Sequence, residues 1–241
     1  MKKLLLGLLL ISSVLSFGAT QRVNIEKLVT NENRDTLYLE ETKKPYSGEV
    51  ERKYPDGKLL GLAIVKDGKL NGKSYEYYEN GKLKIEENYV NGKSEGVSKV
   101  FYPNGKVKYE TPYKNDKKEG VEKFYSENGI LMSEIPFKND VVIGVAKVYN
   151  AQTGKLEYEE NLVNGKRNGL SKKYYPSGKV LNEVNFKDDK EEGIMRVYYE
   201  TGKLQGEIPY KNGQVDGVVK AYDENGKLIE QATFKNGEEV K

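Results

Sequence analysis

The sequence predicts an all-β fold: an elongated, twisted antiparallel sheet of tandem 24-residue β-hairpins with an N-terminal cap. One glycine recurs every 24 residues, with a single step of 25, at Gly48, Gly72, Gly96, Gly120, Gly144, Gly169, Gly193 and Gly217. Between these glycines, runs of β-branched and aromatic residues alternate with Asn-Gly-type turns, which is typical of hairpins. No later window has an apolar period of 3.6 residues. A strict period of this length indicates units that pack only against their neighbours.

The first element is a predicted signal peptide over residues 1–19. Lys2 and Lys3 precede an apolar run at 4–17, and Ser16-Phe17-Gly18 offers a small-x-small cleavage pattern. An uncleaved N-terminal anchor is the alternative, although the run is short for a membrane span. No later segment is apolar enough to span a bilayer. We therefore expect a secreted, periplasmic or outer-envelope protein with no integral membrane span after cleavage.

Residues 20–47 do not match the repeat, and 36–40 have the composition of a strand. We expect this segment to be a cap that covers the edge of the first hairpin, because an open strand edge invites pairing with another chain. Residues 48–241 then form eight tandem hairpins.

The unit from Gly96 shows the predicted register. Strands at 97–102 and 106–113 flank an Asn104-Gly105 turn. If these two residues are the centre of a type I′ turn, Phe101 faces Lys108, Lys99 faces Glu110 and Gly96 faces Tyr113. A basic residue then faces a glutamate in most copies. Such a row is either a recognition stripe or, as exposed ion pairs more often are, a register-fixing ladder.

The same register predicts two packing features. An aromatic residue lies opposite most opening glycines, as Phe137 does for Gly120, and its ring is expected to cover the glycine backbone. Proline cannot donate to a ladder, so Pro112, Pro136 and Pro209 predict looser pairing where one hairpin leads into the next.

A second aromatic position follows the opening glycine by five residues in most copies. Strand alternation places it on the same face as the Lys–Glu row, while the face with Val100 and Tyr113 is the more apolar and is expected to be buried. We interpret the row as a candidate binding surface, because tyrosine is enriched at interfaces; stacking between strands explains it equally well. Its members are Tyr77, Phe101, Tyr125, Tyr149, Tyr174, Tyr198 and Tyr222.

The composition argues against catalysis. The chain contains no histidine and no cysteine, and it has no GxSxG or P-loop motif, so we expect no catalytic residue, no metal and no cofactor. A weak calcium site at Asp188-Asp189 and Glu191-Glu192 is the one alternative. The 40 Lys and Arg residues exceed the 37 Asp and Glu by three, which argues against nucleic acid as the partner.

The repeat resembles the bacterial variant of the MORN repeat. Tyr78-Glu79-Asn80-Gly81-Lys82-Leu83, followed by 89–93 (Tyr-Val-Asn-Gly-Lys), is a good single copy, and in-phase copies extend over 46–241. The resemblance implies a chain of hairpins with a binding or scaffolding role, and bacterial members include antitoxin-like proteins. The chain has no tryptophan, unlike many eukaryotic units, so the phosphoinositide binding attributed to some of those is not carried over.

Three functions are open from the sequence. The first is an exported, non-enzymatic protein–protein interaction module or scaffold at the cell envelope or host interface. The second is a carbohydrate or cell-wall binder that uses the tyrosines as stacking platforms. The third is an antitoxin-like neutralising protein. A protein partner fits the repeat pattern best, carbohydrate is possible, and neither partner is identified by the residues.

Overall fold

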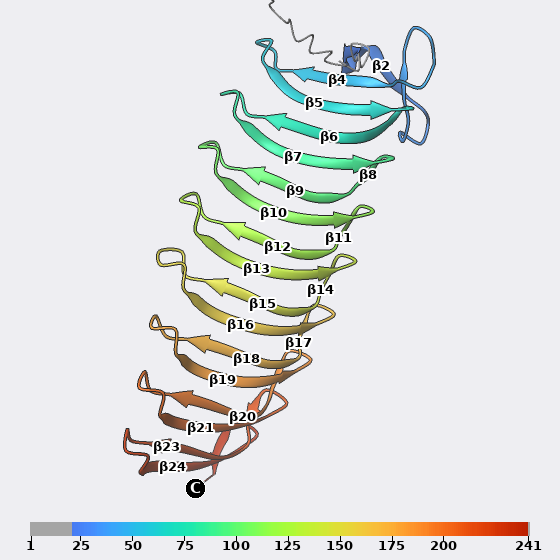
Figure 1. The fold of residues 1–241 in the computed structure, drawn as a ribbon. Coiled ribbons are helices and arrows are strands. Elements are labelled where there is room, and N and C mark those ends of the chain that lie inside the picture. Colours follow the sequence, from blue (N-terminus) through green and yellow to red (C-terminus); the bar gives the residue numbers. More distant parts are fainter. Residues whose placement is uncertain (1–20, 241) are drawn as a thin grey trace, which may run out of the picture.

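The computed structural model describes residues 21–240; the predicted signal peptide lies outside them. The described residues form a long, twisted, open antiparallel sheet of 23 strands and a separate two-stranded sheet, without an α-helix among them. The hairpins follow one another along the length of the molecule, and their turns form two rows along its long edges (Figure 1). This is the predicted fold class.

Each opening glycine but two starts a first strand, which pairs with the second strand of its hairpin. On its other side the first strand pairs with the preceding hairpin in every copy after the first. In the Gly72 and Gly193 copies that strand begins three residues earlier. The hairpins are β4 (Gly48–Lys53) with β5 (Leu59–Lys66), β6 (Lys69–Tyr77) with β7 (Leu83–Val90), β9 (Gly96–Phe101) with β10 (Val107–Lys114), β12 (Gly120–Tyr125) with β13 (Leu131–Lys138), β15 (Gly144–Tyr149) with β16 (Leu156–Val163), β18 (Gly169–Tyr174) with β19 (Val180–Lys187), β20 (Lys190–Tyr198) with β21 (Leu204–Lys211), and β23 (Gly217–Tyr222) with β24 (Leu228–Lys235).

Short strands connect the hairpins. They follow the turns between repeats and pair back onto the end of the preceding long strand, as Lys93 and Ser94 do on β7. These strands are β8 (Lys93–Ser94), β11 (Lys117–Lys118), β14 (Val141–Val142), β17 (Lys166–Arg167), β22 (Gln214–Val215) and the terminal β25 (Glu238–Val240).

The type I′ turn was predicted at the wrong end of the hairpin. At Asn104-Gly105, the N–H of Gly105 donates to the carbonyl of Tyr102 at 2.8 Å, that of Tyr102 donates to Lys106 at 2.8 Å, and only Gly105 has positive φ, +93°. This is the three-residue loop of a type I turn followed by a left-handed glycine. Phe101 therefore pairs with Val107, and the predicted pairing of Phe101 with Lys108 is wrong.

The register further along the strand was nevertheless predicted correctly. Lys108 is an extra residue, a β-bulge, after which Tyr109 pairs with Val100 and Glu110 with Lys99. The loop shifts the pairing by one residue and the bulge shifts it back. A bulge at the corresponding place occurs in all eight hairpins.

True type I′ turns join one repeat to the next. Asn91 and Gly92 have φ of +51° and +82° between the paired residues Val90 and Lys93. Asparagine and aspartate tolerate this conformation better than other non-glycine residues, which explains why Asp-Gly, Asn-Gly, Asn-Asp or Asp-Asp occupies the turn in each copy.

The opening glycines have a role that was not predicted, because all eight adopt positive φ. Gly120 pairs with Phe137, as predicted, but a Cβ on Gly120 would meet Pro112 Cγ of the preceding hairpin at 2.9 Å, and no atom of the Phe137 ring within 4 Å. Gly120 also has φ of +120°, which side chains disfavour. Backbone conformation and contact with the preceding proline therefore favour glycine at this position.

The prolines lie where pairing between hairpins is interrupted, as predicted, but copies with Asn88 or Asn161 at this position show the same interruption. β10 pairs with β12 at Tyr109 and Glu110 only, and pairing resumes at Tyr113 with Lys118 of β11. Pro112 lies in the interruption. Its carbonyl still accepts the N–H of Glu119 at 3.0 Å, so this backbone acceptor remains satisfied.

The two faces of the sheet differ in burial. The packed face, which includes Val100 and Tyr113, carries the buried residues of the repeats: Val50, Val65, Thr111, Ser171, Val184 and Phe186. On this face Tyr109 and Phe124 of successive hairpins stack with ring centroids 4.8 Å apart. The opposite face carries the Lys–Glu row and is called the ladder face below.

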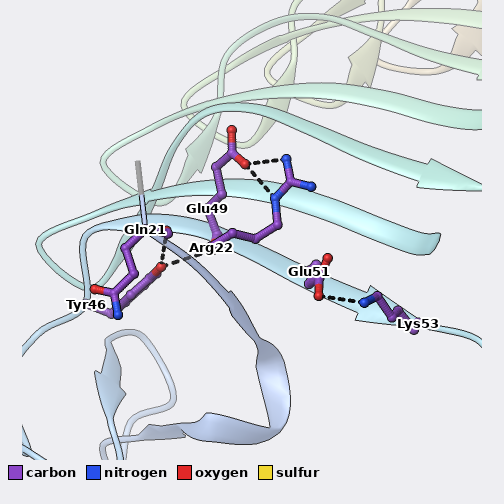
Figure 2. Close-up of polar contacts among 6 residues, drawn as sticks. All are labelled: Gln21, Arg22, Tyr46, Glu49, Glu51 and Lys53. Carbon is purple, nitrogen blue, oxygen red and sulfur yellow. Dashed lines mark hydrogen bonds and ion pairs between the residues drawn. The ribbon is translucent and has the colours of Figure 1, made fainter. Parts of the chain in front are cut away.

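Residues 21–47 cover the first edge of the sheet. β1 (Arg22–Asn24) pairs in parallel with β4, a short 3₁₀ turn follows (Ile25–Lys27), and β2 (Leu28–Thr30) pairs with β3 (Leu37–Leu39) outside the main sheet. Figure 2 shows the Tyr46 hydroxyl donating to the Gln21 carbonyl at 2.5 Å and Arg22 paired with Glu49 at 2.6 Å. The largest buried apolar cluster lies here: Val23, Tyr46, Val50 and Val65.

The ladder face as a candidate binding surface

The predicted charge row is present on the ladder face. Basic and acidic residues that pair across each hairpin form ion pairs in the successive copies from Gly96 to Gly193. The nitrogen–oxygen distances are 3.1 Å for Lys99–Glu110, 3.8 Å for Lys123–Glu134, 3.7 Å for Lys147–Glu159, 3.8 Å for Lys172–Glu183 and 3.8 Å for Arg196–Glu207. The pair in the copy from Gly144 forms despite its longer loop.

The predicted tyrosines join these pairs into a continuous network. Each hydroxyl donates to the glutamate of the preceding hairpin, 15 residues earlier in the chain. The oxygen–oxygen distances are 3.1 Å for Tyr125–Glu110, 2.7 Å for Tyr149–Glu134, 2.6 Å for Tyr174–Glu159, 2.8 Å for Tyr198–Glu183 and 3.3 Å for Tyr222–Glu207. Each glutamate thus links a cation of its own hairpin to a phenol of the next one.

The first two members of the row lie outside this network. Phe101 has no hydroxyl, and Tyr77 lies beside Tyr75 with ring centroids 6.5 Å apart. All seven predicted residues are partly buried. Five of them donate a hydroxyl hydrogen bond to a glutamate of the preceding hairpin. The row therefore contributes to contact between hairpins, and stacking between strands accounts for much of its periodicity.

Two tyrosines of this row have strongly raised pKa values. Partial burial raises the pKa of Tyr149 and of Tyr174 to about 12, and the hydrogen bond to the neighbouring glutamate adds to the effect. Burial followed by the same hydrogen bond also raises the pKa of Tyr125 and Tyr198. The phenolate is disfavoured because its charge would lie next to a carboxylate.

These shifts predict loss of stability in alkali. A phenol whose pKa is higher in the folded chain stabilises it fully below pH 10, and this contribution is lost as the pH rises from 10 toward 12. We expect the melting temperature to fall across this window, and to fall less steeply in the double variant Tyr149→Phe/Tyr174→Phe. Circular dichroism melts at pH 9 and pH 11.5 test this. Tyr38→Phe, outside the row, is the control, and an unchanged slope in the double variant would contradict the prediction.

The structure also shows an apolar row that the sequence reading missed. It consists of residues directly after the opening glycine, which lie on the ladder face beside the charged network. The exposed members are Val97, Val121, Val145, Ile194 and Val218. Strand spacing places successive members about 10 Å apart. The signal was present in the sequence, because the glycine is followed by an apolar residue in every copy from Gly96 onward.

The acidic residues of the candidate calcium site accept hydrogen bonds from the backbone at the turns between repeats. Asp189 accepts the N–H of Arg167 at 2.8 Å, and Glu192 accepts that of Asn212 at 2.9 Å. Their oxygens thus stabilise the stacking of one type I′ turn on the next. Within residues 21–240 no group of three or more His, Cys, Asp or Glu side chains is arranged to hold a metal ion.

No helix in the described part of the chain is long and apolar enough to cross a membrane.

Comparison with known protein families identifies the repeat. A family model described as MORN repeat variant matches six segments, which together cover more than half of the chain: residues 70–91, 94–115, 118–139, 167–188, 191–212 and 215–236. The segments span successive hairpins, and the copy from Gly144, with its extra loop residue, lies between the third and the fourth. No curated protein matches the chain.

Proposed function

Because the chain belongs to the MORN repeat variant family, we propose that it is an exported, non-enzymatic module that binds a protein partner through its ladder face. MORN repeats form repeat-based binding or scaffolding modules, and the long open sheet is of that kind. The proposal adds the surface, the class of partner and the cellular location.

The exposed apolar row is the observation that supports this surface. Val97, Val121 and Val145 expose 47%, 44% and 41% of their area, on one face and at a constant spacing. Single exposed valines need no explanation, but an aligned series next to polar groups is typical of an interaction site. The neighbouring lysines and glutamates neutralise each other, so the surface favours an apolar contact with a polar rim.

Export and the lack of catalysis rest on the sequence. The basic start and apolar run at 1–19 support secretion to the envelope or beyond. The chain offers no histidine or cysteine for acid–base or nucleophilic chemistry, and the glutamates of the ladder are engaged with lysines and tyrosines. Both features favour a binding role over an enzyme.

A protein partner is favoured over carbohydrate. A sugar-stacking platform needs free ring faces, whereas the tyrosines of the row are partly buried and five of their hydroxyls are bonded to glutamates. Neutralisation of an exported toxin would be one case of the proposed protein binding and would use the same surface.

The double variant Val121→Glu/Val145→Glu tests the surface. Both side chains are exposed, so the fold should persist, while two buried carboxylates at the interface should lower crosslinking to the partner in intact cells at least about tenfold. Val148→Glu, at a similarly exposed valine on the opposite face of the sheet, is the matched control. Equal crosslinking by wild type and double variant would refute the ladder face as the binding surface. Loss of binding to purified cell-wall polysaccharide in Tyr125→Ala/Tyr174→Ala would instead favour carbohydrate.

A further inference from the structure

A further row of tyrosines, called the turn tyrosines, links the hairpins at the edge of the sheet where each first strand ends. Each directly follows a residue of the ladder-face aromatic row, or its equivalent in the first hairpin. The hydroxyl donates to a backbone carbonyl of the next hairpin, 23 residues later. The distances are 2.7 Å for Tyr54 to Tyr77, 2.6 Å for Tyr78 to Phe101, 2.8 Å for Tyr102 to Tyr125, 2.7 Å for Tyr175 to Tyr198 and 2.8 Å for Tyr199 to Tyr222.

Three copies have a different residue at this position: Ser126, Asn150 and Asp223. Asp223 belongs to the last hairpin of the sheet, which has no further hairpin beyond it to contact. At Ser126 the Cγ2 of Ile130 lies 3.3 Å from the Cβ position of Gly154 in the next turn. At Asn150 the missing ring leaves a gap.

The gap at Asn150 is a hollow of about 390 Å³. Its apolar lining comes from Leu156, Tyr158, Tyr174, Tyr175, Pro176 and Leu181. The volume is in the lower part of the range of small-ligand pockets, roughly 300–1,000 Å³, and accommodates a phenol ring.

Asn150 itself does not fill the hollow. Its side-chain oxygen accepts the N–H groups of Gln152 at 3.0 Å and Thr153 at 2.9 Å, so it is held by its own longer loop. Among residues 21–240, no tyrosine hydroxyl donates to the carbonyl of Tyr174, although the equivalent carbonyl of Tyr198 accepts the hydroxyl of Tyr175. The hollow thus combines an apolar wall with an acceptor that a phenol satisfies elsewhere in the same sheet.

We propose that this hollow accepts the side chain of a tyrosine from the protein partner, with its hydroxyl donating to the Tyr174 carbonyl. Five turn tyrosines show that this environment fits a phenol, and a partner ring would complete the row. The lining residues Tyr158 and Lys173 pair on the packed face, and Tyr174, whose hydroxyl bonds to Glu159, is the residue that the hollow shares with the ladder face. The inference rests on the proposed protein-binding function and adds the chemistry of the group that is recognised.

The first test uses p-cresol as the probe of the hollow in the chain spanning residues 20–241. Its methylphenol ring should give saturable NMR shifts of the Leu156 and Leu181 methyl groups, and toluene, which lacks the hydroxyl, should bind about fivefold more weakly. Absence of saturable shifts, or equal binding of toluene, would overturn the proposal.

Two variants close the hollow from opposite sides. Asn150→Tyr supplies the missing ring, so p-cresol binding should fall at least tenfold and the melting temperature should rise. Leu181→Trp blocks the hollow without altering the Asn150 loop, and should also abolish binding. Asp223→Tyr adds the same ring in the last hairpin and is the control that should leave binding unchanged. Undiminished binding in both blocking variants would overturn the site.

A random peptide library displayed on phage tests the source of the phenol. Selection on the wild-type chain should enrich peptides containing tyrosine, whose replacement by alanine lowers binding at least tenfold, and selection on Asn150→Tyr should not. Equal enrichment on both chains would overturn the assignment to a protein tyrosine. If Val121→Glu/Val145→Glu abolishes crosslinking while Asn150→Tyr leaves it unchanged, this inference fails and the proposed function stands.

Discussion

Replacing Tyr46 with alanine should lower the free energy of unfolding by about 3–5 kcal/mol, the range for large-to-small aromatic substitutions in a core. Tyr46 is only 4% exposed and packs with Val23, Val50 and Val65 in the largest buried cluster. The variant also loses the hydroxyl that holds the Gln21 carbonyl (Figure 2). Urea unfolding followed by circular dichroism would measure the change.

The loss should be local, because each unit of a repeat sheet contacts only its neighbours. Hydrogen exchange should accelerate in β1, β4 and β5, while β18 to β24 keep their protection. Tyr46→Phe retains the ring and isolates the hydroxyl, with an expected cost of about 1–2 kcal/mol. Uniform loss of protection along the whole chain would show that the hairpins unfold as a single unit and that this expectation is wrong.

Gly120→Ala should destabilise the chain by about 2–3 kcal/mol. The residue has φ of +120°, where a side chain costs about 1–2 kcal/mol, and the new Cβ would lie 2.9 Å from Pro112 Cγ, so one of the two strands must move. Urea unfolding of the purified variant measures this change.

Gly96→Ala is the matched comparison. Gly96 opens the preceding copy with φ of +84°, but no atom lies within 4 Å of its Cβ position. The Gly96→Ala substitution should therefore cost only the free energy of placing a side chain at positive φ. The stability of this variant should remain closer to that of the wild type than the stability of Gly120→Ala. Pro112→Ala should rescue part of the loss in the Gly120→Ala background. Equal costs at Gly96 and Gly120 would mean that the contact with Pro112 is unimportant.

The period and the chemistry of the turns were sufficient to predict the sheet. Glycines 24 residues apart, strands rich in β-branched residues and Asn-Gly turns specify hairpins locally, so no distant contact had to be known. The pairing of Lys99 with Glu110 was predicted for the same reason. It survived an incorrect turn because the loop at Asn104-Gly105 and the bulge at Lys108 shift the register in opposite directions.

The turn types could not be assigned from composition alone. Asn-Gly occurs both within hairpins and between repeats, and the two sites differ in whether the asparagine itself has positive φ, as Asn91 does and Asn104 does not. The part played by Pro112 beside Gly120 was also missed, because it depends on contact between successive hairpins. Register within one hairpin does not report such contacts.

The candidate surface was predicted in part. Alternation placed the aromatic row on the same face as the charges, but only the structure shows that Tyr174 bonds back to Glu159 of the preceding hairpin. The valines after the glycines were overlooked, although the sequence has an apolar residue there in every copy from Gly96 onward. The hollow at Asn150 is visible in sequence only as an interrupted series of tyrosines, and its emptiness depends on how the longer loop folds.

The paired loop and bulge have a consequence for how such a chain varies. Each hairpin restores its own alignment before the next one begins, so the extra residue in the copy from Gly144 leaves Lys147 opposite Glu159. Insertions are thereby contained within the unit in which they arise. Gain or loss of whole copies then changes the length of the ladder face without disturbing its spacing, and binding reach can evolve by duplication alone.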